Sequence, residues 1–162
     1  MIIERLDLTD ENTAEELWSL QHAAYRVEAS LIGVADLPPL RESVADLMAC
    51  GETFWGCRTE DGDLVGAIST EEETEGDTVA LCRVMVHPEH FRQGVGRLLL
   101  THAIGAYPGD VRWEVTAEKR NLPAIALYEK LGFRAVETFA PRPDIAMLRM
   151  RLEPGAGGEA KT

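Results

Sequence analysis

The spacing of apolar residues along the chain changes repeatedly between a period of two and a period of about 3.6. The short period is typical of strands with one buried face, and the long period is typical of helices with one buried face. This pattern predicts strands at 2–8, 53–59, 64–70, 78–86, 111–116, 133–139 and 145–152. It predicts helices at 13–31, 38–48, 94–106 and 123–131.

Residues with special backbone preferences set the expected ends of these elements. Thr13 and Glu16 have the spacing of a capping box at the first helix, and Gly33 is placed to end that helix. Pro38-Pro39 is placed to open the second helix. Asp61-Gly62 is a hairpin signal, so the three strands around and after it should form an antiparallel meander.

The order of the elements predicts an α/β or α+β fold with one mixed, mainly antiparallel sheet. A length of 162 residues favours a single domain, which we expect to occupy 1–152. Residues 153–162 are rich in glycine and poor in apolar side chains, so they are predicted to be a disordered tail.

Charge narrows the classes of partner. The formal net charge is −12, which disfavours nucleic acid and anionic membranes and mildly favours a cationic substrate. No apolar run approaches the ~20 residues that cross a bilayer, so no membrane association is expected. Cys50, Cys57 and Cys82 lack the spacing of a zinc site, and we expect no metal. Cys82, within the strand at 78–86, is expected to be a small buried apolar residue rather than a nucleophile. Reduced thiols are typical of a cytoplasmic protein.

The most informative segment is the loop that joins the strand at 78–86 to the helix at 94–106. Helix N-termini leave main-chain N–H groups unpaired, and Gly94 and Gly96 lack the Cβ atoms that would block a ligand. Arg92 and Arg97 add positive charge to an otherwise acidic chain. The segment therefore predicts a site for a polyphosphate, the alternative being a tight turn that binds nothing.

Two well-known phosphate motifs fit this loop poorly. A dinucleotide-binding unit would use Glu114, 20 residues beyond Gly94, for the ribose. That motif, however, places its first glycine directly after the strand, whereas this strand ends at Val86, and Leu99 occupies the place of the third glycine. A dinucleotide-dependent redox enzyme thus remains a lesser alternative, and the absence of Gly-Lys-Ser/Thr excludes a Walker loop.

Two segments resemble the GCN5-related N-acetyltransferases. Residues 91–96, Phe-Arg-Gln-Gly-Val-Gly, are similar to the acetyl-CoA loop Gln/Arg-x-x-Gly-x-Gly/Ala of that family, except that Phe91 replaces the usual Gln or Arg. Residues 121–133 match the family pattern Asn-x-x-Ala-x-x-Leu-Tyr-x-x-x-Gly-Phe. The two motifs occur in the family's order with a strand between them, and the similarity spans 64–152.

The resemblance implies a sheet of six to seven strands flanked by about four helices, with the strands at 78–86 and 111–116 splayed apart around acetyl-CoA. It implies transfer of the acetyl group to a primary amine by direct attack in a ternary complex. A small-molecule amine and a peptide N-terminus are both candidate acceptors, and a homodimer is an expectation because dimers are common in the family. The alternative is a non-catalytic acyl-CoA-binding module.

The same resemblance implies roles for individual residues. Tyr128 is the candidate acid that protonates the departing thiolate, and a phenol with a pKa of about 10 suits a thiol with a pKa of about 8.5. The alternative for Tyr128 is a core tyrosine. Glu114 is the candidate base, or else an exposed strand residue. Glu28 and the acidic run 71–73 are candidates for lining the acceptor pocket, and the alternative for that run is a solvated turn. The candidates for binding acetyl-CoA are Met85, Val86, Arg92, Gln93, Gly94, Val95, Gly96, Arg97 and Asn121. Asn121 precedes the helix at 123–131, so it is also placed to cap that helix, as an alternative or in addition.

Overall fold

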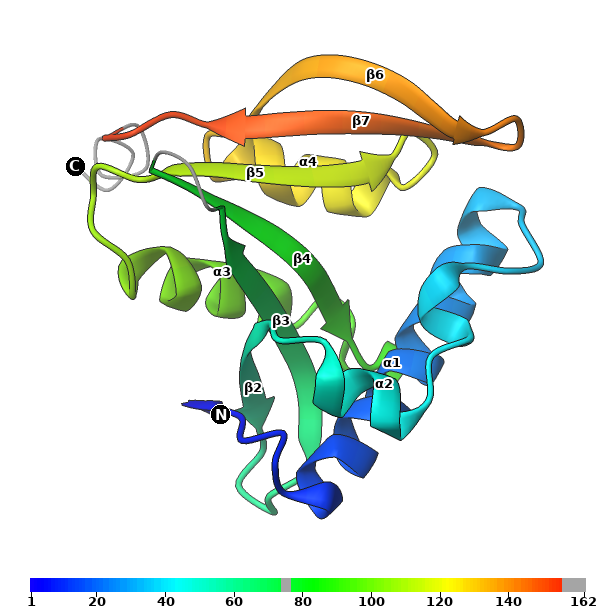
Figure 1. Cartoon of the computed structure of the whole chain (residues 1–162), viewed down its shortest axis with the longest axis vertical. Coiled ribbons are helices and arrows are strands. Elements are labelled where there is room, and N and C mark those ends of the chain that lie inside the picture. Colours follow the sequence, from blue (N-terminus) through cyan, green and yellow to red (C-terminus); the bar gives the residue numbers. More distant parts are fainter. Residues whose placement is uncertain (74–76, 156–162) are drawn as a thin grey trace.

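The computed structural model describes residues 1–73 and 77–155, and in it a seven-stranded sheet carries helices on both faces (Figure 1). The strand order is β1-β2-β3-β4-β5-β7-β6. The strands are β1 (Ile2–Arg5), β2 (Thr53–Arg58), β3 (Leu64–Glu72), β4 (Thr78–Val86), β5 (Arg112–Glu118), β6 (Arg134–Arg142) and β7 (Ile145–Leu152). The helices are α1 (Glu11–Ile32), α2 (Val44–Ala49), α3 (Val95–Gly105) and α4 (Leu122–Lys130), with 3-10 turns η1 (Pro38–Leu40) and η2 (Pro88–His90).

The mixed, mainly antiparallel sheet predicted from the sequence is confirmed. β1 to β4 form an antiparallel meander, and β5, β7 and β6 are also joined antiparallel. Only β4 and β5 run parallel. β1 is shorter than expected, because Asp7 accepts hydrogen bonds from the main-chain N–H and hydroxyl of Thr9 (3.0 and 2.6 Å) and turns the chain away from the sheet.

The predicted capping box at Thr13 is wrong. α1 begins at Glu11 after the N-cap residue Asp10, so Thr13 lies inside the first turn and its hydroxyl donates to Asp10 Oδ2 (2.7 Å). The predicted end is confirmed, since Gly33 adopts a left-handed conformation (φ 75°) and its N–H donates to Ser30 O (3.3 Å).

The single helix predicted at 38–48 is divided in two. Pro38-Pro39 opens only the 3-10 turn η1, and α2 starts afresh after Ser43. The Ser43 side chain accepts from Asp46 N–H (3.1 Å) while the Asp46 carboxylate accepts from Ser43 N–H (2.8 Å). This reciprocal capping box stabilises a separate helix start, and the apolar periodicity that runs through both pieces does not reveal it.

β4 and β5 pair only over three residues each, Thr78–Ala80 with Arg112–Glu114. Beyond this point β4 continues beside β3, β5 continues beside β7, and the two strands diverge (Figure 1). α1 contacts β4 and lies toward the open side of the divergence. The sheet is therefore opened in its middle, as the resemblance implied.

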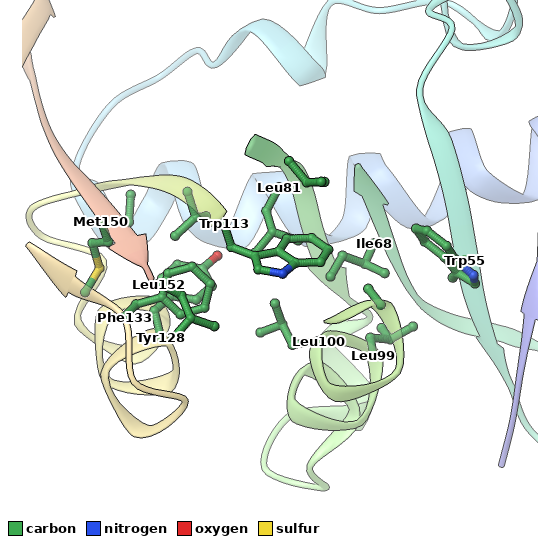
Figure 2. Packing of buried hydrophobic residues seen from close by; sticks show 14 of the residues in the cluster. Trp55, Ile68, Leu81, Leu99, Leu100, Trp113, Tyr128, Phe133, Met150 and Leu152 are labelled. Atoms are coloured by element: carbon green, nitrogen blue, oxygen red, sulfur yellow. The ribbon is translucent and has the colours of Figure 1, made fainter. Parts of the chain in front are cut away.

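Side chains fill the two faces of the sheet with separate clusters. On the α3 and α4 side, Leu99, Trp113, Tyr128 and Phe133 belong to one core (Figure 2). On the α1 and α2 side the cluster includes Leu17, Leu20, Leu47, Phe54, Ala67 and Met85. Each face of the opened sheet is thus held by its own apolar layer.

The tail predicted at 153–162 falls mostly outside the described residues. Glu153 accepts from Arg112 Nε (3.0 Å), and the N–H of Gly155 donates to Gly109 O (3.2 Å). All three cysteines are free, and Cys82 is exposed rather than buried as expected. None of the helices in residues 1–73 and 77–155 is long and apolar enough to cross a bilayer.

Candidate functional site

The loop before α3 has an unusual backbone. Arg92 (φ 64°) and Gly94 (φ 77°) both adopt the left-handed conformation, which costs a non-glycine residue on the order of 1–3 kcal/mol and recurs at ligand-binding loops. The first intrahelical bond runs from the N–H of Leu98 to the carbonyl of Gly94 (3.0 Å). The N–H groups of residues 95–97 precede that bond, so they have no intrahelical acceptor and are available to an anion.

The side chains of this loop divide into two groups. Arg92, Gln93 and Arg97 are exposed, and Gln93 Oε1 lies 3.1 Å from His90 Nδ1. The Val95 side chain is buried in the core, so of this residue only the main chain is available to a ligand.

The two glycines have different surroundings. A Cβ on Gly94 would meet nothing within 4 Å, whereas a Cβ on Gly96 would lie 3.2 Å from Leu127 Cδ2. Gly94 therefore leaves the loop open and supplies the positive φ, while Gly96 allows α3 to approach α4.

The free edge of β4 presents main-chain groups to the gap between β4 and β5. The N–H of His87 donates to Val65 O on the β3 side (2.8 Å), and successive residues of a strand direct their main-chain groups to opposite edges. The groups of Val86 and Val84 therefore face the gap. Those of Met85 face its partner Ala67 on β3. Of Met85 and Val86, the two residues of β4 predicted to bind acetyl-CoA, only Val86 has its main chain directed toward the gap.

Tyr128 of α4 lies in the core that α3 and α4 form with the sheet. Its side chain is 5% exposed and packs with Phe133 (ring centroids 5.8 Å apart), and its hydroxyl points away from α4 toward the strands (Figure 2). Burial, and then the negative charge of Glu28, raise the pKa of Tyr128, so the phenol is protonated at neutral pH. Its hydroxyl has no hydrogen-bond partner in the described residues, yet it is not an orphaned buried atom, so it keeps contact with solvent.

Asn121 joins α4 to α1. Its Oδ1 accepts from the N–H of Ala124 (3.3 Å), which confirms the predicted helix cap. Its Nδ2 donates to Glu28 Oε1 (2.7 Å). Glu28 in turn lies one turn beyond Tyr25 on α1, and its pKa is raised by burial and by the charge of Glu118. The structure thus brings Asn121, Glu28, Tyr25 and Tyr128 together.

Glu114 lies apart from this group. Its neighbours Trp113 and Val115 belong to the α3 and α4 core, so strand alternation directs Glu114 to the opposite face. It sits on the three-residue parallel pairing, opposite Ala80, and its Oε1 lies 3.4 Å from Arg151 Nη2.

A second charged cluster, on β4, was missed by the sequence argument. Arg83 is buried and donates to Gln21 (2.9 Å), to Glu42 (2.6 Å) and to Glu52 (2.9 Å). Burial opposes the charge of Arg83, but the two carboxylates outweigh it and raise the pKa. The cluster ties α1 and the segments flanking α2 to β4. A lone arginine within an apolar strand was the only signal for it.

An open hollow of about 530 Å³ lies near the end of α1. Gly33 and Val34, the loop after β5, and the turn between β6 and β7 line it. Its wall includes Glu118, whose pKa falls to about 2 because Arg120 pairs with it. In residues 1–73 and 77–155, no three His, Cys, Asp or Glu side chains gather in a way that could hold a metal ion.

Comparison with solved structures identifies the fold. The ribosomal-protein-S18-alanine N-acetyltransferase of Escherichia coli superposes with a TM-score of 0.73 at 23% identity, over 94% of this chain and 93% of that one. An aminoglycoside 6'-N-acetyltransferase complexed with coenzyme A superposes with a TM-score of 0.72 at 18% identity, over 94% and 96% of the two chains. The arrangement of strands and helices is therefore that of known N-acetyltransferases.

Comparison of sequences identifies the family. The UPF0157 protein YqkA of Bacillus subtilis (strain 168) is 35% identical over 153 residues, which are 94% of this chain. The chain spans only 44% of the length of that relative. The profile of the acetyltransferase (GNAT) family matches residues 11–133, which is most of the chain. The protein therefore belongs to the acetyltransferase (GNAT) family.

Proposed function

We propose that the protein transfers the acetyl group of acetyl-CoA to a primary amine by direct attack in a ternary complex. The observation that carries this proposal is the divergence of β4 from β5, together with the loop between β4 and α3, where Arg92 and Gly94 are left-handed, and the Tyr128 hydroxyl directed toward the strands. The cofactor of the aminoglycoside acetyltransferase with the same fold supports the choice of a CoA thioester.

The loop has the chemistry that a diphosphate requires. Unpaired N–H groups of residues 95–97, the open space over Gly94 and the positive charges of Arg92 and Arg97 would hold the diphosphate. Gln93 follows Arg92 in sequence and is exposed in the same loop, so it would also contact the ligand. Main-chain groups of Val86 would hold the pantetheine arm or the thioester oxygen, where negative charge develops during attack.

Tyr128 suits the role of general acid. The buried phenol is protonated at neutral pH, and its hydroxyl points from α4 toward the strands. When the C–S bond breaks, the thiolate requires a proton, and the hydroxyl of Tyr128 can donate it. Asn121 positions this helix through its cap.

The test measures thiol release from acetyl-CoA in the presence of 2-phenylethylamine, spermidine and an alanyl peptide, together with calorimetric titration of CoA. We expect CoA to bind and at least one amine to accelerate thiol release. Binding of CoA without thiol release for any amine would favour a non-catalytic acyl-CoA-binding module. Thermal protection by a nicotinamide dinucleotide but not by CoA would contradict the proposal altogether.

A further inference from the structure

We infer that Glu28 binds the ammonium group of the acceptor and takes its first proton. This inference rests on the proposed acetyl transfer and names the residue that acts as its base. It assigns a function to a carboxylate of α1, outside both segments that resemble the family motifs.

The geometry leaves one oxygen of Glu28 available to a ligand. Asn121 Nδ2 holds Oε1 at 2.7 Å, and Oε2 has no hydrogen-bond partner among the residues that the structure describes. Because the same Asn121 side chain caps α4, it fixes the carboxylate relative to the helix that carries Tyr128. A half-buried carboxylate is thereby held beside the candidate acid.

Glu28 has no positively charged partner among the described residues. The groups that face it are Tyr25 from α1 itself, Tyr128 and Asn121 from α4 and its cap, and Glu118 from β5. Arg120 pairs with Glu118 (2.7 Å), and Arg83 pairs with Glu42 and Glu52. Within the described part of the chain no Lys or Arg pairs with Glu28. A buried carboxylate without a counter-ion is unfavourable, and an ammonium ligand would relieve that cost.

Two other carboxylates could be considered for the role of base, Glu114 and Glu118, but each of them has an arginine partner. The Oε1 of Glu114 lies 3.4 Å from Arg151. Glu118 accepts from Arg120 and from the N–H of Ala146 (2.9 Å). Glu28 is the one among these three that pairs with no Lys or Arg in residues 1–73 and 77–155.

The chemistry of acetyl transfer requires such a group. A primary amine with a pKa of about 10.4 is neutral in only about one molecule in 10³–10⁴ at pH 7, and only the neutral form attacks. Burial raises the pKa of Glu28, which makes its carboxylate a stronger base than an exposed one.

The protons balance as follows. Glu28 takes one proton from R–NH3⁺, and the neutral nitrogen forms a C–N bond to the thioester carbon. The C–S bond breaks as the thiolate takes the proton of Tyr128. The nitrogen then loses its second proton to the Tyr128 phenolate, and Glu28 releases its proton to solvent. The products are the amide, CoA thiol and one proton.

Replacing Glu28 by Gln tests the inference without removing the acceptor for Asn121. At pH 7.5 we expect kcat/KM for the amine to fall about 10²- to 10³-fold, the usual contribution of a general base. The KM for acetyl-CoA should be unchanged. The deficit of Glu28→Gln should shrink toward pH 9, because free amine becomes abundant in solution. Glu15→Gln, an exposed change on the same helix, is the matched control and should behave as the wild type.

A binding measurement separates this inference from the proposed function. 2-Phenylethylamine is titrated into the CoA-saturated wild type and the Glu28→Gln variant, and uncharged 2-phenylethanol serves as the control ligand. We expect only the amine to bind the wild type and its affinity to fall at least tenfold in the variant. Amine binding that depends on Glu28 without any thiol release would sustain the ammonium-binding role of Glu28 and reject both its role as base and acetyl transfer.

The remaining outcomes are equally decisive. Wild-type thiol release that Glu28→Gln leaves unchanged would overturn the role of Glu28 and leave acetyl transfer intact. Loss of activity in Glu114→Gln with retention in Glu28→Gln would reassign the base to Glu114. Absence of both turnover and amine binding in the wild type would reject both proposals.

Discussion

The side-chain nitrogen of Asn121 lies 2.7 Å from Oε1 of Glu28, although 93 residues separate them in sequence. The side-chain oxygen of the same amide accepts a hydrogen bond from the N–H of Ala124 and so caps α4. One side chain therefore fixes the start of α4 and its distance from α1 at the same time.

Asn121→Asp should separate these two contributions. The aspartate keeps an acceptor for the N–H of Ala124 but places a negative charge against Glu28, so we expect a loss of about 1–3 kcal/mol in unfolding free energy at pH 7. Like charge raises the pKa of both carboxyls in the folded state. The loss should therefore diminish as pH falls through those raised values. Urea unfolding at pH 7 and pH 4.5 measures it, and an equal loss at both values would contradict the charge argument.

Tyr128→Phe should lower kcat by about 10²- to 10⁴-fold if the hydroxyl protonates the thiolate. Because this hydroxyl has no hydrogen-bond partner in the described residues, thermal stability should not fall. Tyr107→Phe is the matched control. It removes a hydroxyl that lies 2.9 Å from Thr70, so it should cost about 1 kcal/mol of stability and leave kcat near the wild-type value. Steady-state thiol release and thermal melting test both variants, and full activity in Tyr128→Phe would exclude the acid role.

Replacing Arg92 and Arg97 together by Ala should weaken CoA binding by about 10- to 100-fold, equivalent to roughly 1.4–2.8 kcal/mol. Both side chains are exposed, so part of this effect should disappear at high salt through screening. Calorimetric titration of CoA at two ionic strengths measures both quantities. Arg134→Ala, an exposed position on β6, should leave the affinity unchanged. Equal affinity in the double variant and the wild type would place the diphosphate elsewhere.

Gly96→Val should destabilise the protein by about 1–3 kcal/mol, because the new side chain would press against Leu127. Gly105→Val is the matched control in the same helix, where a Cβ would meet nothing within 4 Å. Adding Leu127→Ala should recover part of the loss only in the Gly96 variant. A double-mutant cycle by urea unfolding gives this coupling, and its absence would show that α3 and α4 do not meet at Gly96.

Arg83→Met should cost about 3–5 kcal/mol at pH 7, because it leaves two carboxylates without their cation. In the wild type, burial opposes ionisation of Glu52 but hydrogen bonds from Arg83 and Ser69 prevail and lower its pKa. The stability that Glu52 contributes is present above its unfolded pKa near 4.5 and is lost as pH falls through the lower folded value.

The difference in unfolding free energy between the wild type and Arg83→Met should therefore decrease on acidification from pH 7 to pH 4. Urea unfolding at both values measures it. Arg41→Met, at an exposed ion pair, is the control and should change stability by no more than about 0.5 kcal/mol. A difference in unfolding free energy that stays constant with pH would show that ionisation of the two carboxylates does not account for the loss of stability.

Most elements of the fold were predictable because their signals are local. The alternating segments became strands and Gly33 ended α1 as expected, since these features depend on residues within a turn or two. The start of α1 and the break before α2 were not predictable. They depend on Asp10 and on the Ser43–Asp46 capping box, which compete with equally plausible local signals at Thr13 and Pro38.

The candidate site divides in the same way. The loop at 91–97 and the helix of Tyr128 were predicted from adjacent residues, and so was the cap at Asn121. The binding role of the loop, the acid role of Tyr128 and the homodimer stay predictions. Glu114 was chosen from its place on the strand and from the family resemblance, but its orientation depends on which face of the sheet α3 and α4 cover.

The amino-acid sequence by itself determined the succession of strands and helices, the glycine-containing loop and the family of the protein, because periodicity and short motifs are carried by neighbouring residues. Only the tertiary structure decided that Glu28 meets Asn121 and Tyr128, and that Arg83 gathers Glu42 and Glu52. Those contacts join segments tens of residues apart. Their positions follow from how the helices pack on the opened sheet, which no local pattern specifies.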